Sequence, residues 1–218
     1  MNSKWCKGFL VRDKKLGRGG RPRSFDIDAA LGVGQQLFHE RGYDGVSLSD
    51  LTRALGIAAP SFYAAFGSKA AFFQQILNRH ANAALPIDEF LVEGRPLAAA
   101  IEQFLVARAV TYSESAEAKG CLVLDATRNC SDACASAAAE QIAEDGRLRM
   151  RERIAESRPD LAEPISDLVA SIMHGLSALA RQGWSTNRLV AAARNAALSV
   201  RSMVDDPKRL GWVAGATI

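Results

Sequence analysis

The sequence predicts an all-α protein, with a small N-terminal helical domain and a larger helical domain after it. Apolar residues recur at spacings of three and four along most of the chain, which is the helical period. The alternation of apolar and polar residues that is typical of strands is scarcely found. Apolar residues make up 48% of the 218 residues, which is enough for a sizeable core.

The first residues form a basic segment. Residues 1–25 contain eight lysines and arginines and a single acid, mixed with glycine and proline. Such a composition does not fold by itself, so we expect a flexible basic arm over residues 1–24. One interpretation is that Arg18, Arg21 and Arg23 reach DNA phosphates or a narrow minor groove. The alternative is a solvated tail without a partner.

The first helix is predicted over residues 25–41. Its apolar positions follow the helical period, and Gly42 ends it. Two glycines inside it, Gly32 and Gly34, weaken the helix by up to about 1 kcal/mol each relative to alanine. We therefore expect close packing against a neighbouring helix at these positions. His39, near the end of the helix, is expected at the surface.

Residues 47–69 read SLSDLTRALGIAAPSFYAAFGSK and predict two short helices joined by a tight turn. Ser47 caps the first helix, with Asp50 three residues on as in a capping box. Gly56 ends that helix, because glycine adopts a positive φ without a steric cost. Pro60 suits the first turn of the next helix, where a missing N–H costs nothing. This is the helix-turn-helix arrangement, which places its second helix in the major groove of DNA.

The segment LFHERGYDGVSLSDLTRALGIAAPSFYAAFGSKAAFF, within residues 25–77, resembles the DNA-binding domain of the tetracycline-repressor (TetR) family. The shared features are a leading helix that ends near a glycine, the helix-turn-helix, and a Tyr, Phe, Ser-Lys run that opens the next helix. The resemblance implies phosphate contacts by Tyr63 and Lys69. It further implies that Ser47 and Ser49 face the DNA and that the residues nearest the base edges are Ala59, Pro60 and Ser61.

A fourth helix follows, capped by Ser68, with an apolar stripe that runs toward His80. In the family this helix connects the two domains, and its tilt sets the spacing of the two DNA-reading heads. Proline and glycine mark the loop LPIDEFLVEGRP after it, and the domain boundary is expected there or just before. The prediction is a DNA-binding domain with its connector over residues 25–83, and an effector-binding and dimerisation domain over residues 84–218.

Beyond Pro96 the chain is alanine-rich and helical. We predict a buried helix near residues 97–112, a long helix over residues 132–156, and two last helices near residues 164–183 and 185–206. The last two have wide apolar faces with small residues, which suits a four-helix bundle made by two chains. The alternative is that both faces are consumed inside one chain. We favour a homodimer, because two-fold pairing places two heads roughly 34 Å apart on a palindromic operator.

The middle helices carry more apolar and aromatic side chains than their packing requires. The residues expected to line a pocket for an unknown small-molecule effector are Phe104, Arg108, Tyr112, Cys121, Asp125, Met150, Met173, His174 and Trp184. Arg108 and Asp125 are the pair of most interest, because an inward-facing charge needs a partner or a polar ligand.

Three cysteines suggest an alternative, a thiol-based redox or electrophile sensor that uses Cys121, Cys130 and Cys134. A metal-binding pair is disfavoured, since no CxxC motif or histidine cluster accompanies them, and we expect no metal. The chain has no G-x-S-x-G elbow, glycine-rich phosphate loop or H-E-x-x-H motif. We therefore expect no catalytic residues and no cofactor, and an all-helical enzyme is the remote alternative.

Positive charge gathers at the helix-turn-helix end of the chain. The overall charge is +3, but residues 1–69 have a balance of +5 and residues 70–218 a balance of −2. No apolar run reaches the roughly 18 to 20 residues of a membrane span, and no signal peptide is apparent, so we expect a cytoplasmic protein. The sequence thus predicts a DNA-binding transcriptional regulator, a repressor released when a small molecule prefers the conformation that binds DNA poorly.

Overall fold

The computed structural model describes residues 26–84, 86–115 and 118–206, and within them every regular element is helical. The predicted all-α class is confirmed. The predicted basic arm, with Arg18, Arg21 and Arg23, lies outside the described residues. The helices are α1 (Ile27–Arg41), α2 (Leu48–Leu55), α3 (Ala59–Phe66), α4 (Lys69–Asn82), η1 (Ile87–Glu89), α5 (Leu97–Glu114), α6 (Leu122–Ala126), α7 (Ala133–Ala155), α8 (Ala162–Arg181) and α9 (Thr186–Asp205).

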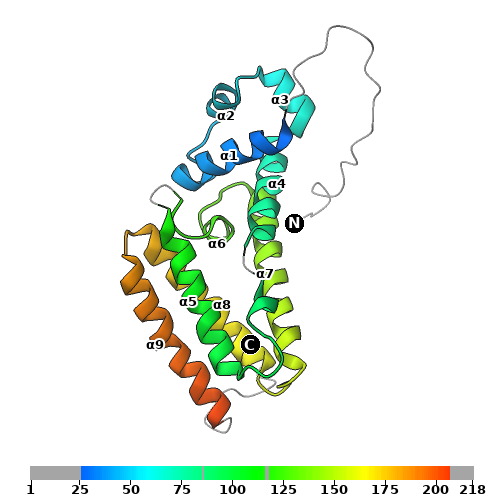
Figure 1. Ribbon diagram of the computed structural model, residues 1–218. Coiled ribbons are helices and arrows are strands. Elements are labelled where there is room, and N and C mark those ends of the chain that lie inside the picture. The colour runs from blue at the N-terminus through cyan, green and yellow to red at the C-terminus, as the bar shows by residue number, and fades with distance from the viewer. Residues whose placement is uncertain (1–25, 85, 116–117, 207–218) are drawn as a thin grey trace.

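The molecule is elongated, with α1, α2 and α3 at one end and α5, α8 and α9 in the larger half (Figure 1). Helix α4 runs from the small end into the larger half, where it packs against α7. The short α6 lies at the junction between the two halves. Among the described residues, no helix combines the length and the apolar content that a membrane span requires.

The helix-turn-helix forms through the local interactions that its sequence predicts. The Ser47 hydroxyl accepts a hydrogen bond from the Asp50 N–H at 3.1 Å, and the Asp50 carboxylate accepts one from the Ser47 N–H at 2.9 Å. This reciprocal pair is the predicted capping box. Gly56 has φ 64° and ψ 31°, the left-handed conformation that ends α2, and Pro60 lies in the first turn of α3.

Aromatic side chains fill the core of the small end. Phe62 and Phe66 of α3 both pack on Phe72 of α4, with ring centroids 5.2 Å and 4.4 Å from it. A Cβ atom added at Gly34 would lie 2.5 Å from the Phe72 ring, so this glycine lets α1 lie close against α4. The close packing predicted for the glycines of α1 is confirmed at this position.

The core of the larger half is formed by α5, α8 and α9, together with Met150 and Ile154 of α7. Helix α9 packs mainly against α5 and buries Leu189, Ala193, Ala197 and Val200 there. The wide apolar face predicted for α9 is therefore largely buried against α5 of the same chain. Helix α8 begins at Ala162, two residues before the predicted start at Pro164, because proline is tolerated within a first helical turn.

The two halves share part of their packing. Besides α1 to α4, the core of the small end contains side chains from α6 and from the first turns of α7. The Tyr43 hydroxyl donates a hydrogen bond to the Asp132 carboxylate at 3.0 Å, and the Asp44 carboxylate accepts two from Ser131, at 2.9 Å and 2.6 Å. The loop between α1 and α2 is thereby tied to the start of α7. Movement of either half should be transmitted through this joint.

Candidate nucleic-acid interface and interior cavity

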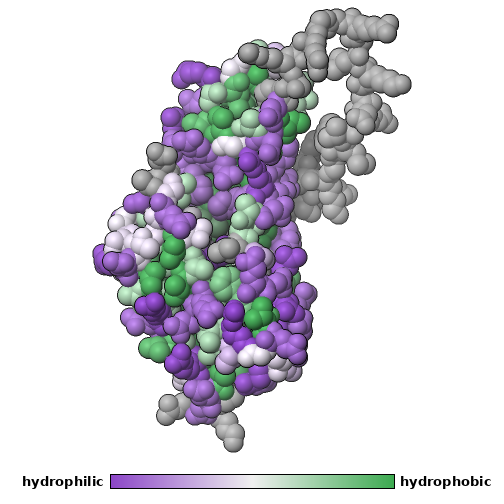
Figure 2. Space-filling model, in the orientation of Figure 1, coloured by the Kyte–Doolittle hydropathy of each residue, from purple (hydrophilic) through white to green (hydrophobic). Residues whose placement is uncertain are grey.

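Helix α3 has one buried face and one exposed face. Phe62 and Phe66 are buried and anchor it, whereas Pro60, Ser61 and Tyr63 are exposed, with Tyr63 at 51%. In the orientation of Figure 2, apolar surface is visible on the part of the molecule built by α2 and α3. An anchored helix with a small-residue outer face has the shape that a major groove admits. This face is the candidate nucleic-acid interface.

The structure also places the other residues with predicted DNA contacts. The Ser47 hydroxyl is engaged in the cap of α2, and Ser49 is exposed beside it. Lys69 opens α4, with its ammonium 4.0 Å from the centre of the Tyr43 ring, and burial lowers its pKa. A phosphate contact would draw Lys69 away from that ring. The roles inferred for these residues, and for Ala59, remain predictions, and Arg21 and Arg23 lie outside the described residues.

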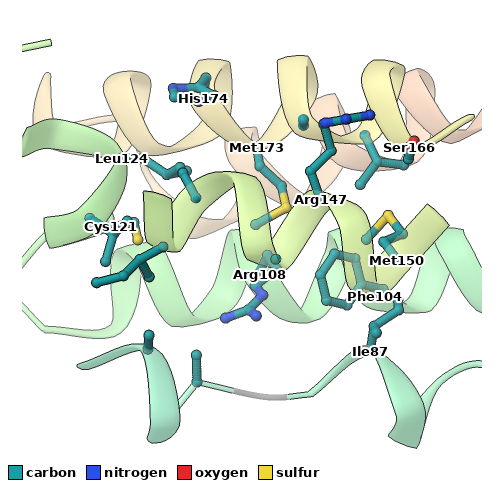
Figure 3. Close-up of a pocket in the computed structure, with 18 of the residues that line it drawn as sticks. Ile87, Phe104, Arg108, Cys121, Leu124, Arg147, Met150, Ser166, Met173 and His174 are labelled. Carbon is teal, nitrogen blue, oxygen red and sulfur yellow. The ribbon is translucent and has the colours of Figure 1, made fainter. Parts of the chain in front are cut away.

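The larger half contains a cavity of about 180 Å³ between α4, α5, α6, α7 and α8 (Figure 3). Seven of the nine residues expected at a pocket line it: Phe104, Arg108, Tyr112, Cys121, Met150, Met173 and His174. Sequence reasoning did not assign His80, Arg147 or Ser166, which also line it. His80 was recognisable in principle, because it lies on the same helical face as Phe73, Ile76 and Leu77 of α4.

Asp125 and Trp184 lie outside the cavity. The Asp125 carboxylate is buried and has the partner that an inward-facing charge needs, because it pairs with Arg181, Oδ1 to Nε 3.3 Å. The short α6 directs Cys121 and Leu124 into the cavity and leaves Asp125 toward the end of α8. Trp184 follows α8, where its ring stacks with the Arg188 guanidinium at 3.7 Å.

His39 is buried at 5% exposure, so the prediction that it lies at the surface is wrong. Its ring packs edge-on against His80, with centroids 5.4 Å apart, and its carbonyl oxygen accepts a hydrogen bond from Arg181 at 3.2 Å. Burial and the Arg181 charge lower the pKa of His39. Burial lowers the pKa of His80 to about 4, with added repulsion from His39 and Arg108. Both imidazoles are therefore neutral near pH 7.

The His80 pKa makes the stability of the fold depend on pH in one direction. Above the unfolded value of 6.5 both states are neutral, but between 6.5 and about 4 only the unfolded chain binds the proton. We expect His80 alone to remove up to about 3 kcal/mol of stability as the pH falls through this window. Urea unfolding at both ends of the window, on the wild type and on His80→Gln, measures this loss. Parallel loss in the two proteins would contradict it.

Two of the three described cysteines, Cys121 and Cys130, have environments that disfavour thiolates. Burial raises the pKa of Cys121 at the cavity wall and that of Cys130 near the start of α7. Because the thiolate is the reactive form, raised values argue against the thiol-sensor alternative. The described residues also contain no group of three or more histidine, cysteine or acidic side chains placed to hold a metal ion.

An exposed, anchored second helix of a helix-turn-helix, together with a cavity in the helical half, defines a DNA-binding transcriptional regulator. The family model described as bacterial regulatory proteins, tetR family, matches residues 30–76. The chain is 34% identical over 198 residues to the HTH-type transcriptional repressor BdcR of Escherichia coli (strain K12), covering 90% of this chain and 100% of BdcR. The chain belongs to the tetR family of bacterial regulatory proteins.

Two further relatives agree with this assignment. The HTH-type transcriptional repressor ComR of Escherichia coli (strain K12) is 28% identical over 188 residues, covering 80% of this chain and 88% of ComR. Among solved structures, a cysteine mutant of the TetR family transcriptional regulator CifR, complexed with 26-base-pair double-strand operator DNA, superposes with a TM-score of 0.67. It is 29% identical, covering 82% of this chain and 99% of that chain.

Proposed function

We propose that this protein is a cytoplasmic repressor that binds a palindromic operator as a homodimer and leaves it when a small molecule enters the cavity. The observation that carries the proposal is the course of one helix. The first residue of α4, Lys69, lies beside the helix-turn-helix, and His80 in its last turns lines the cavity. A ligand that displaces His80 must therefore move the element that carries the DNA-reading helices. The names of BdcR and ComR as repressors support the same direction of control.

The mechanism is a linkage between two binding equilibria. A ligand weakens operator binding only by its own preference for the conformation that binds DNA poorly. His80 contacts both the DNA-binding half and the cavity wall. Its ring packs on His39 of α1, and its Nε2 lies 3.6 Å from the Cys121 thiol at the cavity wall. The tie between Arg181 and the His39 carbonyl adds α8 to the same joint. Through these contacts, a ligand that displaces His80 would shift α1 as well as α4.

The homodimer is proposed to form through α8 and α9. Helix α8 places Leu168, Ile172, Gly175 and Leu179 at spacings of four, three and four, and none of them is fully buried. Leu198 of α9 is 57% exposed. Figure 2 shows apolar surface over the half that holds α5 and α9. Such partly exposed apolar stripes suit the pairing of two copies into a four-helix bundle.

The test is footprinting of the purified protein on the DNA upstream of its own gene. We expect two protected half-sites about 34 Å apart, related by a two-fold axis, because each copy supplies one reading helix. Protection should be lost on adding a ligand that fills the cavity. Uniform protection of all DNA would indicate a packaging protein, and absence of any footprint would contradict a regulatory function at this site.

A further inference from the structure

One end of the cavity is polar and carries positive charge. The residues that meet there are Arg108, Tyr112, Cys121 and His80. The Cys121 thiol lies 3.6 Å from the His80 imidazole, and burial, with added repulsion from His39 and Arg108, lowers the pKa of His80. The Arg108 guanidinium lies 5.0 Å from the centre of the Phe104 ring. In Figure 3 the Arg108 side chain lies between Cys121 and Phe104. The polar end therefore adjoins an aromatic wall.

The charged side chains of the cavity wall are all basic. Its described lining residues include Arg108, Arg147, His80 and His174, but no aspartate or glutamate. Arg147 forms ion pairs with Glu144, Glu163 and Asp167, and in Figure 3 it lies on the side of Ser166. The histidines have lowered pKa values through burial. Arg108 brings a positive charge to the polar end of the cavity.

A second group at this end requires an acceptor. Tyr112 is only 3% exposed, and its hydroxyl makes no hydrogen bond of acceptable geometry with any described residue. The Cys121 thiol lies beside it, but sulfur is a weak acceptor. A buried hydroxyl without a partner destabilises the empty protein, and a ligand oxygen would satisfy it. Arg108 and Tyr112 together select for an anionic oxygen.

The remaining walls are mainly apolar and limit the size of the ligand. Phe104, Met150, Val169 and Met173 surround the space away from the polar end. An apolar protein cavity of about 150 Å³ is known to take a benzene molecule. A cavity of about 180 Å³ therefore has room for one aromatic ring, or an aliphatic group of that size, with a small head group.

We propose that the effector is a small monoanionic carboxylic acid with one aromatic ring or an aliphatic body of that size, its carboxylate held by Arg108 and Tyr112. The inference rests on the proposed function, because it names the class of ligand for the same cavity. The carboxylate accepts a charge-assisted hydrogen bond from the guanidinium and a second one from the phenol. The ring lies against Phe104 and the methionines, which contact aromatic rings well.

The experiment measures ligand binding to the full chain by calorimetry without DNA, with three probes of nearly equal shape. We expect benzoate to bind at least about tenfold more tightly than neutral benzamide, because a hydrogen bond to a charged group is stronger than one to a neutral group. Cationic benzylamine should not bind. Equal binding of benzoate and benzamide, or no binding of benzoate at millimolar concentration, would overturn the proposal.

Variants locate the site. Arg108→Gln should lower benzoate affinity to that of benzamide, whereas Arg108→Lys should keep the preference for the anion. Tyr112→Phe should weaken benzoate several-fold and yet raise the thermal midpoint of the empty protein, because it removes an unsatisfied buried hydroxyl. Arg201→Gln, which neutralises an arginine of α9 that does not line the cavity, should leave benzoate binding within about twofold. An equal loss of benzoate binding in Arg108→Gln and in Arg201→Gln would refute the assignment.

A second measurement separates this inference from the proposed function. Operator binding is measured with and without saturating benzoate. Release of the operator on adding benzoate supports both the carboxylate site and the proposed repressor function. Tight, Arg108-dependent binding of benzoate without any change in operator affinity would leave the anion site in place and reject control by ligand release. Release of the operator by neutral or cationic compounds alone would support control by ligand release and reject the anion site.

Discussion

Ser61→Glu is expected to abolish operator binding without weakening the fold. Ser61 is exposed on α3, and its hydroxyl forms no hydrogen bond with a described residue. A glutamate at this third helical position would accept a hydrogen bond from the backbone N–H of Ala58, the N-cap residue that provides no side-chain cap. The same carboxylate would face the phosphates and base edges of the groove, where a like charge costs several kcal/mol per head. The loss in affinity should be at least about 100-fold.

The matched control is Ser61→Gln, which has the same size and no charge. Fluorescence anisotropy on labelled operator gives the affinities, and thermal unfolding gives the stability. The glutamine variant should keep measurable binding, and the unfolding midpoints of both variants should equal or exceed that of the wild type. Retention of tight binding by Ser61→Glu would show that α3 does not enter the groove.

The DNA-binding end could be predicted from the sequence because its signals are local. The cap of Ser47, the turn at Gly56 and the proline of α3 are each determined by residues within a few positions. Even the packing of Gly34 on α4 follows from two glycines in one short helix. Such features need no knowledge of distant parts of the chain, and the structure reproduces them.

The burial of His39 could not be predicted in this way. Its partners come from far along the chain: His80 from α4, and Arg181 from the end of α8. A polar residue near a helix end is ordinarily exposed, and only the joint between the two halves changes that. The junction is therefore where reasoning from local sequence failed, and in the proposed mechanism it is also the region that couples the cavity to the DNA-binding helices.

The cavity was predictable in composition but not in pairing. Aromatic and sulfur-containing side chains on α5, α7 and α8 indicated an interior that packing does not fully fill. The partner of each charge was not encoded locally, because Asp125 and Arg181 lie 56 positions apart. The sequence predicts that Asp125 needs a partner or a polar ligand, and the partner proves to be Arg181 at the end of α8.

The largest effect on stability is expected from Arg181→Met. Arg181 connects three parts of the junction: it pairs with Asp125 at 3.3 Å and donates hydrogen bonds to the carbonyl oxygens of Lys119 and His39, each at 3.2 Å. Without the guanidinium the Asp125 side chain, 8% exposed, becomes a buried and uncompensated charge. Breaking a buried pair from one side costs about 3–5 kcal/mol. Urea unfolding measures this loss.

The control is Arg201→Met, which breaks the exposed pair with Glu102, 3.1 Å apart, and should cost less than about 1 kcal/mol. Adding Asp125→Asn to Arg181→Met should restore a large part of the stability, because the amide oxygen can still accept from Asn129 and no charge stays buried. The rescued protein tests the junction separately from the fold. With the tie to the His39 carbonyl absent, effector binding should persist while its influence on operator affinity falls. Equal losses for Arg181→Met and Arg201→Met would show that the buried pair does not hold the two halves together.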